Sequence, residues 1–359
     1  MANQRLADRT PVVPRDELIA GLVPPPLFQG VRFDTYRPNP DEPTQAAAVI
    51  ALEAFAARLN GGGPRSGRFR RLGAGTGGPG RRRAGSDAPN GIYLDGGFGV
   101  GKTHLLASLW HAAPAPKAYA TFVELTHLAG ALGFAAVVEA LGGMRLLAID
   151  EFELDDPGDT VLVSTLLARL AERGVALAAT SNTLPDRLGE ERFATDDFLR
   201  EIQGLAARFS AVRVDGPDYR HRGLPAAPAP LSDEAVRAGV ASSDSDAATL
   251  DDFPALVAHL GRLHPSRYGA LVDGVEAVGL LGLEPAADQA VALRLVVLVD
   301  RLYDRQIPVL ASGVPVDQLF APDMLAGGYR KKYRRAISRL VALTQFGAER
   351  VGGGHGVPA

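Results

Sequence analysis

Short apolar runs alternate with amphipathic stretches between residues 91 and 216, and this pattern predicts an α/β core. Five runs are typical of buried strands, at residues 91–96, 119–125, 144–150, 175–181 and 210–216. Helical patterns lie near residues 102–112, 124–141, 159–172 and 196–208. Regular alternation of strand and helix implies right-handed parallel crossovers, so we expect a five-stranded parallel sheet with helices on both faces.

The segments on either side of this core differ from it in composition. Prolines are frequent between residues 24 and 44, which predicts an extended arm, and a helix is expected from near Thr44 to Asn60. Residues 61–90 are rich in glycine and arginine without periodicity, which is typical of a flexible insertion. A Pro- and Ala-rich connection after Arg222, also expected to be disordered, leads to a second unit with helical patterns at 252–263, 288–304 and 328–346.

The changes of composition along the chain predict four segments. They are an N-terminal arm and helix (1–60), the flexible insertion (61–90), the α/β core (91–220) and a mainly helical, lid-like C-terminal domain (221–350). Strand-like runs at 277–283 and 307–313 belong to the last of these.

Charge and composition narrow the possible partners and compartment. The formal net charge is -3, so we do not expect nucleic acid as a partner, and the seven arginines of 61–90 are more typical of a solvated linker. The chain has no cysteine, which excludes disulfides, thiolate metal sites and a catalytic thiol. We find no signal peptide and no apolar run long enough for a membrane span, so we expect a cytoplasmic protein.

The strongest chemical signal is a glycine-rich loop directly after the first predicted strand. It matches G-x-x-x-x-G-K-[ST], in which backbone N–H groups and a helix N-terminus cradle phosphates. The alternative is a glycine-rich turn that matches by chance, but the predicted strand before the loop and the predicted helix after it disfavour that. The chain has four lysines against 34 arginines, so a lysine at this position of the motif is also not background. We expect Lys102 to hold the β- and γ-phosphates and the Thr103 hydroxyl to bind Mg²⁺. The expected nucleotide-binding residues are Gly96, Gly97, Phe98, Gly99, Val100, Gly101, Lys102, Thr103 and His104.

Polar residues follow two later strands at what would be the same edge of the sheet. Asp150 and Glu151 come directly after the apolar run 146–149, and ligands bind at the carboxyl ends of parallel strands. We expect Asp150 to orient magnesium and Glu151 to activate the attacking water. Asn182, after the run 175–181, is expected to hydrogen-bond the γ-phosphate or its water, unless Thr-Ser-Asn is ordinary turn chemistry.

One additional strand and helix lie between the phosphate loop and the strand that ends at Asp150. Together with Glu151 and Asn182, this order of elements resembles that of AAA+ ATPases. More narrowly, the chain resembles the ZapE-type cell-division ATPases, which are related to mitochondrial AFG-like ATPases. The strings that carry this resemblance are VRFDTYRPNPDEPTQAAA, YLDGGFGVGKTHLL, LLAIDEFELDDPGD, ATSNTLPDRL, FLREIQGLAARFSAVRVDGPDYR, LVDRLYDRQIPVLASG and YRRAISRL, between residues 24 and 345.

The resemblance implies an AAA+ fold, hydrolysis of ATP with Mg²⁺ in a homo-oligomeric ring, and action on FtsZ-type filaments at cell division. The mitochondrial relatives are linked to protein quality control. It also implies an arginine that reaches the neighbouring subunit's nucleotide, for which Arg208 is preferred over Arg192 and Arg200. An arginine of the lid is expected at the phosphates of its own chain, and Arg294 and Arg339 are the candidates, although Leu293 replaces the first member of the family's arginine pair. Tyr36 and Gln45 are candidates for contact with the adenine.

Two other functions are compatible with the same core. A DNA-associated AAA+ loader would need a dedicated DNA-binding domain, and none is evident beyond the basic insertion and the basic C-terminal helix. A nucleotide-gated binding module that does not turn over is disfavoured by Glu151, because loss of that carboxylate is the simplest way to bind without hydrolysing. The leading hypothesis is therefore an ATPase with Glu151, Lys102, Asn182 and Arg208 in catalysis and Thr103 and Asp150 on Mg²⁺.

Overall fold

The structure is a computed structural model of the 359-residue chain. It describes residues 4–61, 90–97, 99–154, 157–183, 203–204, 206–217, 227–242 and 247–352. Nearly all of the basic insertion, the predicted helix at 196–208 apart from its last residues, and part of the Pro- and Ala-rich connection lie outside these ranges.

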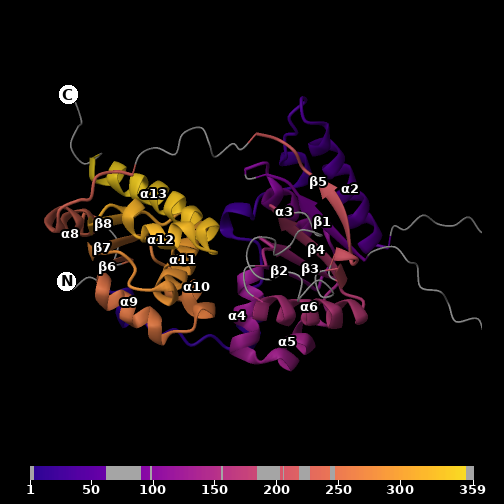
Figure 1. The fold of residues 1–359 in the computed structure, drawn as a ribbon, viewed down its shortest axis with the longest axis horizontal. Coiled ribbons are helices and arrows are strands. Elements are labelled where there is room, and N and C mark those ends of the chain that lie inside the picture. Colours follow the sequence, from indigo (N-terminus) through magenta and orange to yellow (C-terminus); the bar gives the residue numbers. More distant parts are fainter. Residues whose placement is uncertain are drawn as a thin grey trace, which may run out of the picture.

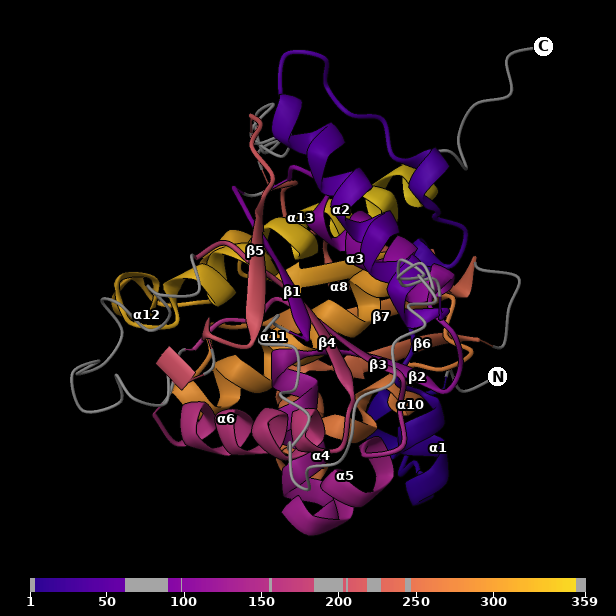
Figure 2. The same ribbon diagram turned by 90° about the vertical axis from the view of Figure 1, so that its right-hand side faces the viewer.

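The N-terminal half is built on a five-stranded parallel sheet with the order β2-β3-β4-β1-β5 (Figures 1 and 2). The strands are β1 Gly91–Asp95, β2 Lys117–Thr121, β3 Leu146–Asp150, β4 Ala176–Ser181 and β5 Phe209–Arg213. Strand β4 lies between β3 and β1 and runs parallel to both, so the carboxyl ends of these three strands are neighbours. The predicted five-stranded parallel sheet is confirmed.

Helices cover both faces of this sheet, because successive residues of each buried strand point to opposite sides. On β3, Leu146 and Ala148 pack with α2 and α3, whereas Leu147 and Ile149 pack with α4, α5 and α6. Figure 1 shows the two layers on either side of the strands. The helices are α2 Pro43–Leu59, α3 Lys102–Ala112, α4 Phe122–Leu132, α5 Phe134–Leu141 and α6 Pro157–Glu172.

The C-terminal half is mainly helical, and its helices surround a three-stranded parallel sheet of order β6-β7-β8. The strands are β6 Ala248–Asp252, β7 Ala277–Leu283 and β8 Val309–Gly313, and the helices are α8 Asp233–Ala241, α9 Phe253–Arg262, α10 Tyr268–Leu271, α11 Gln289–Asp304, α12 Pro322–Ala326 and α13 Arg330–Gly352. Helices α11 and α13 face the first half of the molecule (Figure 1).

The N-terminal arm joins the two halves. Leu6 is fully buried in the C-terminal core, and its backbone N–H, like that of Ala7, donates to Asp251 at 2.9 Å. Beyond the short helix α1 (Arg15–Ala20), Leu22 packs in the core of the first half and its carbonyl accepts from the backbone N–H of Tyr119 at 2.8 Å. The arm therefore contacts both hydrophobic cores.

Several boundaries differ from the sequence prediction; β5, for example, ends at Arg213 rather than at residue 216, and two differences change the elements around α4. The second strand is Lys117–Thr121 rather than 119–125, because Thr121 and Glu124 form a capping box that starts α4 at Phe122. The helix expected over 124–141 is two helices, since Gly133 has a φ of +84° and separates α4 from α5. Among the described residues no single helix is long and apolar enough to span a membrane; α4 and α5 reach that length together but are bent by 118°.

Candidate functional site

The glycine-rich loop forms a tight connection between β1 and α3. Gly99 and Gly101 have φ values of +75° and +91°, which side chains rarely tolerate, and a Cβ on Gly96 would lie 2.0 Å from the carbonyl oxygen of Val214. Helix α3 begins at Lys102, so its first backbone N–H groups face the hollow of the loop. Phe98 lies outside the described residues.

The Lys102 ammonium group points back into this loop, where only 9% of the residue is exposed. Its Nζ donates to the carbonyl oxygens of Gly96 at 2.7 Å and Gly97 at 2.5 Å, and to Asn182 Oδ1 at 2.9 Å. The cation therefore lies between the phosphate loop and the end of β4. It is placed where a phosphate group in the loop would meet a positive charge.

The Asp150 carboxylate lies at the end of β3 and is held by hydroxyl groups. Oδ1 accepts from Thr103 Oγ1 at 3.3 Å and from Thr180 Oγ1, and Oδ2 accepts from the Tyr119 hydroxyl at 2.9 Å. Burial, followed by the negative charge of Asp150, raises the pKa of Tyr119 well above its ordinary value, so Tyr119 stays a proton donor.

The residues present fit a magnesium ion that also binds phosphate oxygens. A carboxylate and a hydroxyl oxygen, Asp150 Oδ1 and Thr103 Oγ1, lie 3.3 Å apart beside the phosphate loop, and both are oxygen ligands of the kind Mg²⁺ prefers. No group of three or more His, Cys, Asp or Glu residues in the described part of the chain could hold a metal. Mg²⁺ is typically bound by one or two protein oxygens together with substrate phosphates, which suits this arrangement.

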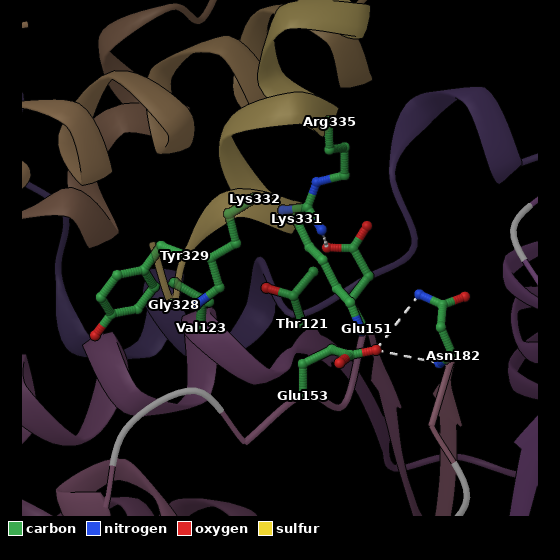
Figure 3. A pocket seen from close by; sticks show the side chains of 10 residues that line it. All are labelled: Thr121, Val123, Glu151, Glu153, Asn182, Gly328, Tyr329, Lys331, Lys332 and Arg335. Atoms are coloured by element: carbon green, nitrogen blue, oxygen red, sulfur yellow. Dashed lines mark hydrogen bonds and ion pairs between the residues drawn. The ribbon is translucent and has the colours of Figure 1, made fainter. Parts of the chain in front are cut away.

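Glu151 has an unusual backbone and an unusual pairing. Its φ is +53°, and its N–H donates to Asp150 Oδ1 and Thr180 Oγ1, both at 3.1 Å. Its carboxylate forms ion pairs with two arginines of α13, with Arg335 and with Arg339 at 3.4 Å (Figure 3 shows the first). The candidate base is thus in contact with the C-terminal half.

The same two arginines share a second carboxylate. Asp300 of α11 pairs with Arg335 at 3.0 Å and with Arg339. Burial alone would raise the pKa of Asp300, but the charges of Arg339 and Arg335 outweigh it and lower that pKa. Two cations and two anions therefore meet where the C-terminal half contacts the end of β3.

A cavity of about 510 Å³ extends from this contact between the two halves. Thr103, Asp150 and Glu151 line it from the first half, and Asp300 and Arg339 line it from the second. The side of the glycine-rich loop at Thr103 therefore opens into a space that both halves enclose.

The arm lies against the phosphate loop. The Tyr36 hydroxyl donates to the carbonyl of Val100 at 2.8 Å, and a Cβ on Gly101 would lie 2.6 Å from the Tyr36 ring. His104 Nε2 lies 2.9 Å from Thr35 Oγ1 and 3.2 Å from the carbonyl of Arg32. Gln45 is buried, accepting from the backbone N–H of Asn39 and donating to the carbonyl of Asp215, both at 2.8 Å.

The arginines that the sequence offered as candidates for phosphate contact lie in different parts of the structure. Arg208 directly precedes β5, at the amino end of the sheet and one strand length from the phosphate loop of its own chain. Arg294 donates to the carbonyls of Leu260 and Leu263 at 3.0 Å, whereas Arg339 faces Glu151. Of the two lid candidates, Arg339 is therefore the one beside the site. Arg192 and Arg200 lie outside the described residues.

The sequence analysis gave no role to several residues of this site, among them Tyr119, Glu153, Thr180, Asp300 and Arg335. Tyr119 and Arg335 lie 31 and 184 positions from their partners Asp150 and Glu151, so spacing along the chain carries no signal for either contact. For Glu153 there is a local signal, since it belongs to the string IDEFE after β3.

Comparison with known proteins gives both a family and relatives. The AFG1-like ATPase family matches residues 12–243 and 224–349. Cell division protein ZapE of Escherichia coli K12 is 28% identical over 293 residues, which is 70% of this chain and 76% of that protein. An uncharacterized protein of Schizosaccharomyces pombe, C115.02c, is 29% identical over 150 residues, 37% of this chain and 33% of that protein.

The similar solved structures include DnaI and the replication initiator DnaA. The structure of DnaI has a TM-score of 0.39 at 15% identity, covering 55% of this chain and 97% of that one. DnaA bound to AMPPCP and single-stranded DNA has a TM-score of 0.36 at 13% identity, covering 54% of this chain and 51% of that one.

Proposed function

The chain belongs to the AFG1-like ATPase family and is an ATP-hydrolysing enzyme, and we propose that it hydrolyses Mg-ATP at the edge of the sheet where β1, β3 and β4 end. The observation that carries this proposal is the convergence of four groups at the carboxyl ends of three neighbouring strands, β1, β3 and β4. They are the Lys102 ammonium, the Thr103 hydroxyl, the Asp150 carboxylate and the Asn182 amide.

Each of these groups has a defined task. Lys102 and the backbone N–H groups of the loop Gly96–Thr103 bind the β- and γ-phosphates, and Thr103 and Asp150 hold Mg²⁺. When bound, Mg²⁺ supplies positive charge that stabilises the developing negative charge on the phosphates. Tyr119 and Thr180 keep the Asp150 carboxylate in place by donating to its two oxygens.

Glu151 accepts a proton from the attacking water, and Asn182 positions that water. The Glu151 carboxylate must separate from Arg335 and Arg339 before it can accept a proton, because an ion-paired carboxylate is a weaker base. Both arginines line the cavity that Thr103 and Asp150 also line, and a γ-phosphate in that cavity would offer them another anionic partner. Arg294 donates to the carbonyls of Leu260 and Leu263, so of the two lid candidates we assign the contact with phosphate to Arg339.

Catalysis further depends on a neighbouring subunit. Arg208 precedes β5 by one residue, and a five-residue strand of about 16 Å separates the amino end of the sheet from the phosphate loop. Arg208 is therefore placed for contact with another subunit's nucleotide rather than its own, and a homo-oligomeric ring supplies that contact.

We assign the ATPase to cell division in the cytoplasm, with FtsZ-type filaments as its partner. The support is the similarity to a cell division protein over 70% of the chain. Protein quality control is the alternative suggested by the family, and a DNA-associated loader is the other AAA+ alternative. Neither has a residue-level observation in its favour.

The test is Mg²⁺-dependent ATP turnover across protein concentration, with and without FtsZ filaments. Lys102→Ala should lose ATP binding and turnover, whereas Glu151→Gln should bind ATP without turning it over. Glu53→Gln on the exposed face of α2 is the matched control and should behave as wild type. Specific activity should rise with concentration and rise again with filaments.

Each part of the proposal has its own contradicting result. ATP binding without turnover at any concentration would overturn the hydrolytic assignment of this site. Turnover that is independent of concentration would refute the role of Arg208 in a ring, and no response to filaments would refute the division partner.

A further inference from the structure

Glu153 lies beside Asn182 and accepts hydrogen bonds from it (Figure 3). One carboxylate oxygen, Oε1, accepts from the Asn182 backbone N–H at 3.1 Å and from Asn182 Nδ2 at 3.4 Å. The same oxygen accepts from Ser181 Oγ at 3.1 Å. This carboxylate therefore holds Ser181 and Asn182 against the segment after β3, in addition to the hydrogen bonds that Thr180 accepts from the N–H groups of Glu151 and Phe152.

These contacts decide how the amide of Asn182 is oriented. An ammonium group only donates hydrogen bonds, so Lys102 requires the amide oxygen, which lies 2.9 Å away. A carboxylate only accepts, so Glu153 requires the amide nitrogen. Because both neighbours favour the same orientation, a flipped amide would place a donor against Lys102 and an acceptor against Glu153.

We propose that Glu153 is a positioning residue for ATP hydrolysis, which fixes the amide of Asn182 with its oxygen towards Lys102. The inference rests on the proposed function, since Asn182 is assigned there to the attacking water. An amide nitrogen carries two hydrogens, so Asn182 can donate one to Glu153 and the other to that water or a phosphate oxygen.

A small pocket beside these residues has room for a water molecule. Glu151, Glu153, Asn182 and Arg335 line it, and its volume of about 40 Å³ exceeds the space that one water needs (Figure 3). The Asn182 amide therefore borders the same space as the Glu151 carboxylate. An error in its orientation affects the chemical step more than ATP binding, because the phosphate loop supplies most of the binding contacts.

Steady-state kinetics of single and double variants test the proposal. We expect Glu153→Ala to lower kcat about tenfold with little change in KM for ATP, as the loss of a charged hydrogen bond would. Glu153→Gln keeps an acceptor oxygen and should recover most of this loss. In an Asn182→Ala background Glu153→Ala should have no further effect, because Glu153 acts through Asn182. Glu53→Ala is the surface control.

A second measurement does not depend on turnover. The chain contains five asparagines, so selective labelling with ¹⁵N-asparagine gives five side-chain amide signals, and Asn182→Asp identifies the signal of Asn182. In the nucleotide-free protein Glu153→Ala should shift this signal and speed its hydrogen exchange while leaving the other four in place.

The outcomes separate the inference from the proposed function. An unchanged Asn182 signal in Glu153→Ala, or kcat losses that multiply in the double variant, would overturn the positioning role. A shifted signal in a protein that does not hydrolyse ATP would support the placement of the amide by Glu153 and overturn the ATPase assignment of the site.

Discussion

Replacing Glu151 by glutamine removes the negative charge that two arginines of α13 face, and we expect this change to destabilise the folded protein. Among the described residues, Asp300 would then be the one carboxylate still ion-paired with Arg335 and Arg339, so two cations would share a single paired anion. Removing one partner of a fully buried ion pair costs about 3–5 kcal/mol. Here the side chains of Arg335, Arg339 and Glu151 are 16%, 17% and 25% exposed, which lets water screen part of the charge.

The expected loss is therefore smaller, about 2 kcal/mol in the free energy of unfolding. For a chain of this length such a loss corresponds to a fall in Tm of about 3 °C. Urea unfolding without nucleotide measures it, and Glu53→Gln, on an exposed part of α2, should change the free energy by less than about 0.5 kcal/mol.

A double-mutant cycle identifies the cause of the loss. Arg335→Met removes one of the two cations, so in the Glu151→Gln background it should restore the balance of charge around Asp300. The double variant should then be more stable than the sum of the single effects predicts, by about 1–2 kcal/mol. Additive effects would refute the reasoning, since they would mean that Glu151 and Arg335 do not interact in the folded protein.

Three further predictions concern the hydroxyl beside Asp150, the arm and the response to pH. Tyr119→Phe removes a 2.9 Å hydrogen bond to Asp150 and should raise the Mg²⁺ concentration for half-maximal turnover about fivefold, measured by Mg²⁺ titration at saturating ATP. Leu6→Ala empties a fully buried site and should lower the free energy of unfolding by about 2–5 kcal/mol in urea; an unchanged midpoint would contradict the packing of the arm. Burial raises the pKa of Asp304 from 3.8 to about 6, so the stability that this carboxyl group contributes is lost as pH rises through that range. Burial lowers the pKa of His127 from 6.5 to about 4, so the stability that this imidazole contributes is lost as pH falls through that range. When the pH is lowered from 6.5 to 4.5, the free energy of unfolding of Asp304→Asn should therefore fall more than that of wild type, and that of His127→Gln should fall less. Each difference should be up to about 3 kcal/mol, measured by urea unfolding at the two pH values.

The elements of the sheet were predictable because their signals are local. Buried strands such as 146–150 are unbroken apolar runs, and the loop Gly96–Thr103 carries its motif within eight residues. The border at Phe122 was placed wrongly because the apolar run continues through it into α4. A capping box was nevertheless present in the sequence, as Thr121 followed three residues later by Glu124, and gave the correct start of the helix.

The contacts around the candidate base were not predictable, because they join residues far apart in the chain. Glu151 meets Arg339 across 188 positions and lies at a positive φ that no sequence pattern announces. Hydrophobic periodicity places α13 on a core, but it does not reveal which partner its polar face meets. Only the folded arrangement shows that Arg335 and Arg339 face the end of β3 rather than solvent.

The arm limits how far the two halves can separate. It contacts the C-terminal core at Leu6 and the backbone of β2 at Leu22, which is 16 positions further along the chain, and α1 lies between these two points. Fully extended, 16 residues span at most about 55 Å, and the helical turns of α1 shorten this reach. The same arm continues to Tyr36, whose hydroxyl donates to the Val100 carbonyl, so one segment contacts the C-terminal core, β2 and the glycine-rich loop.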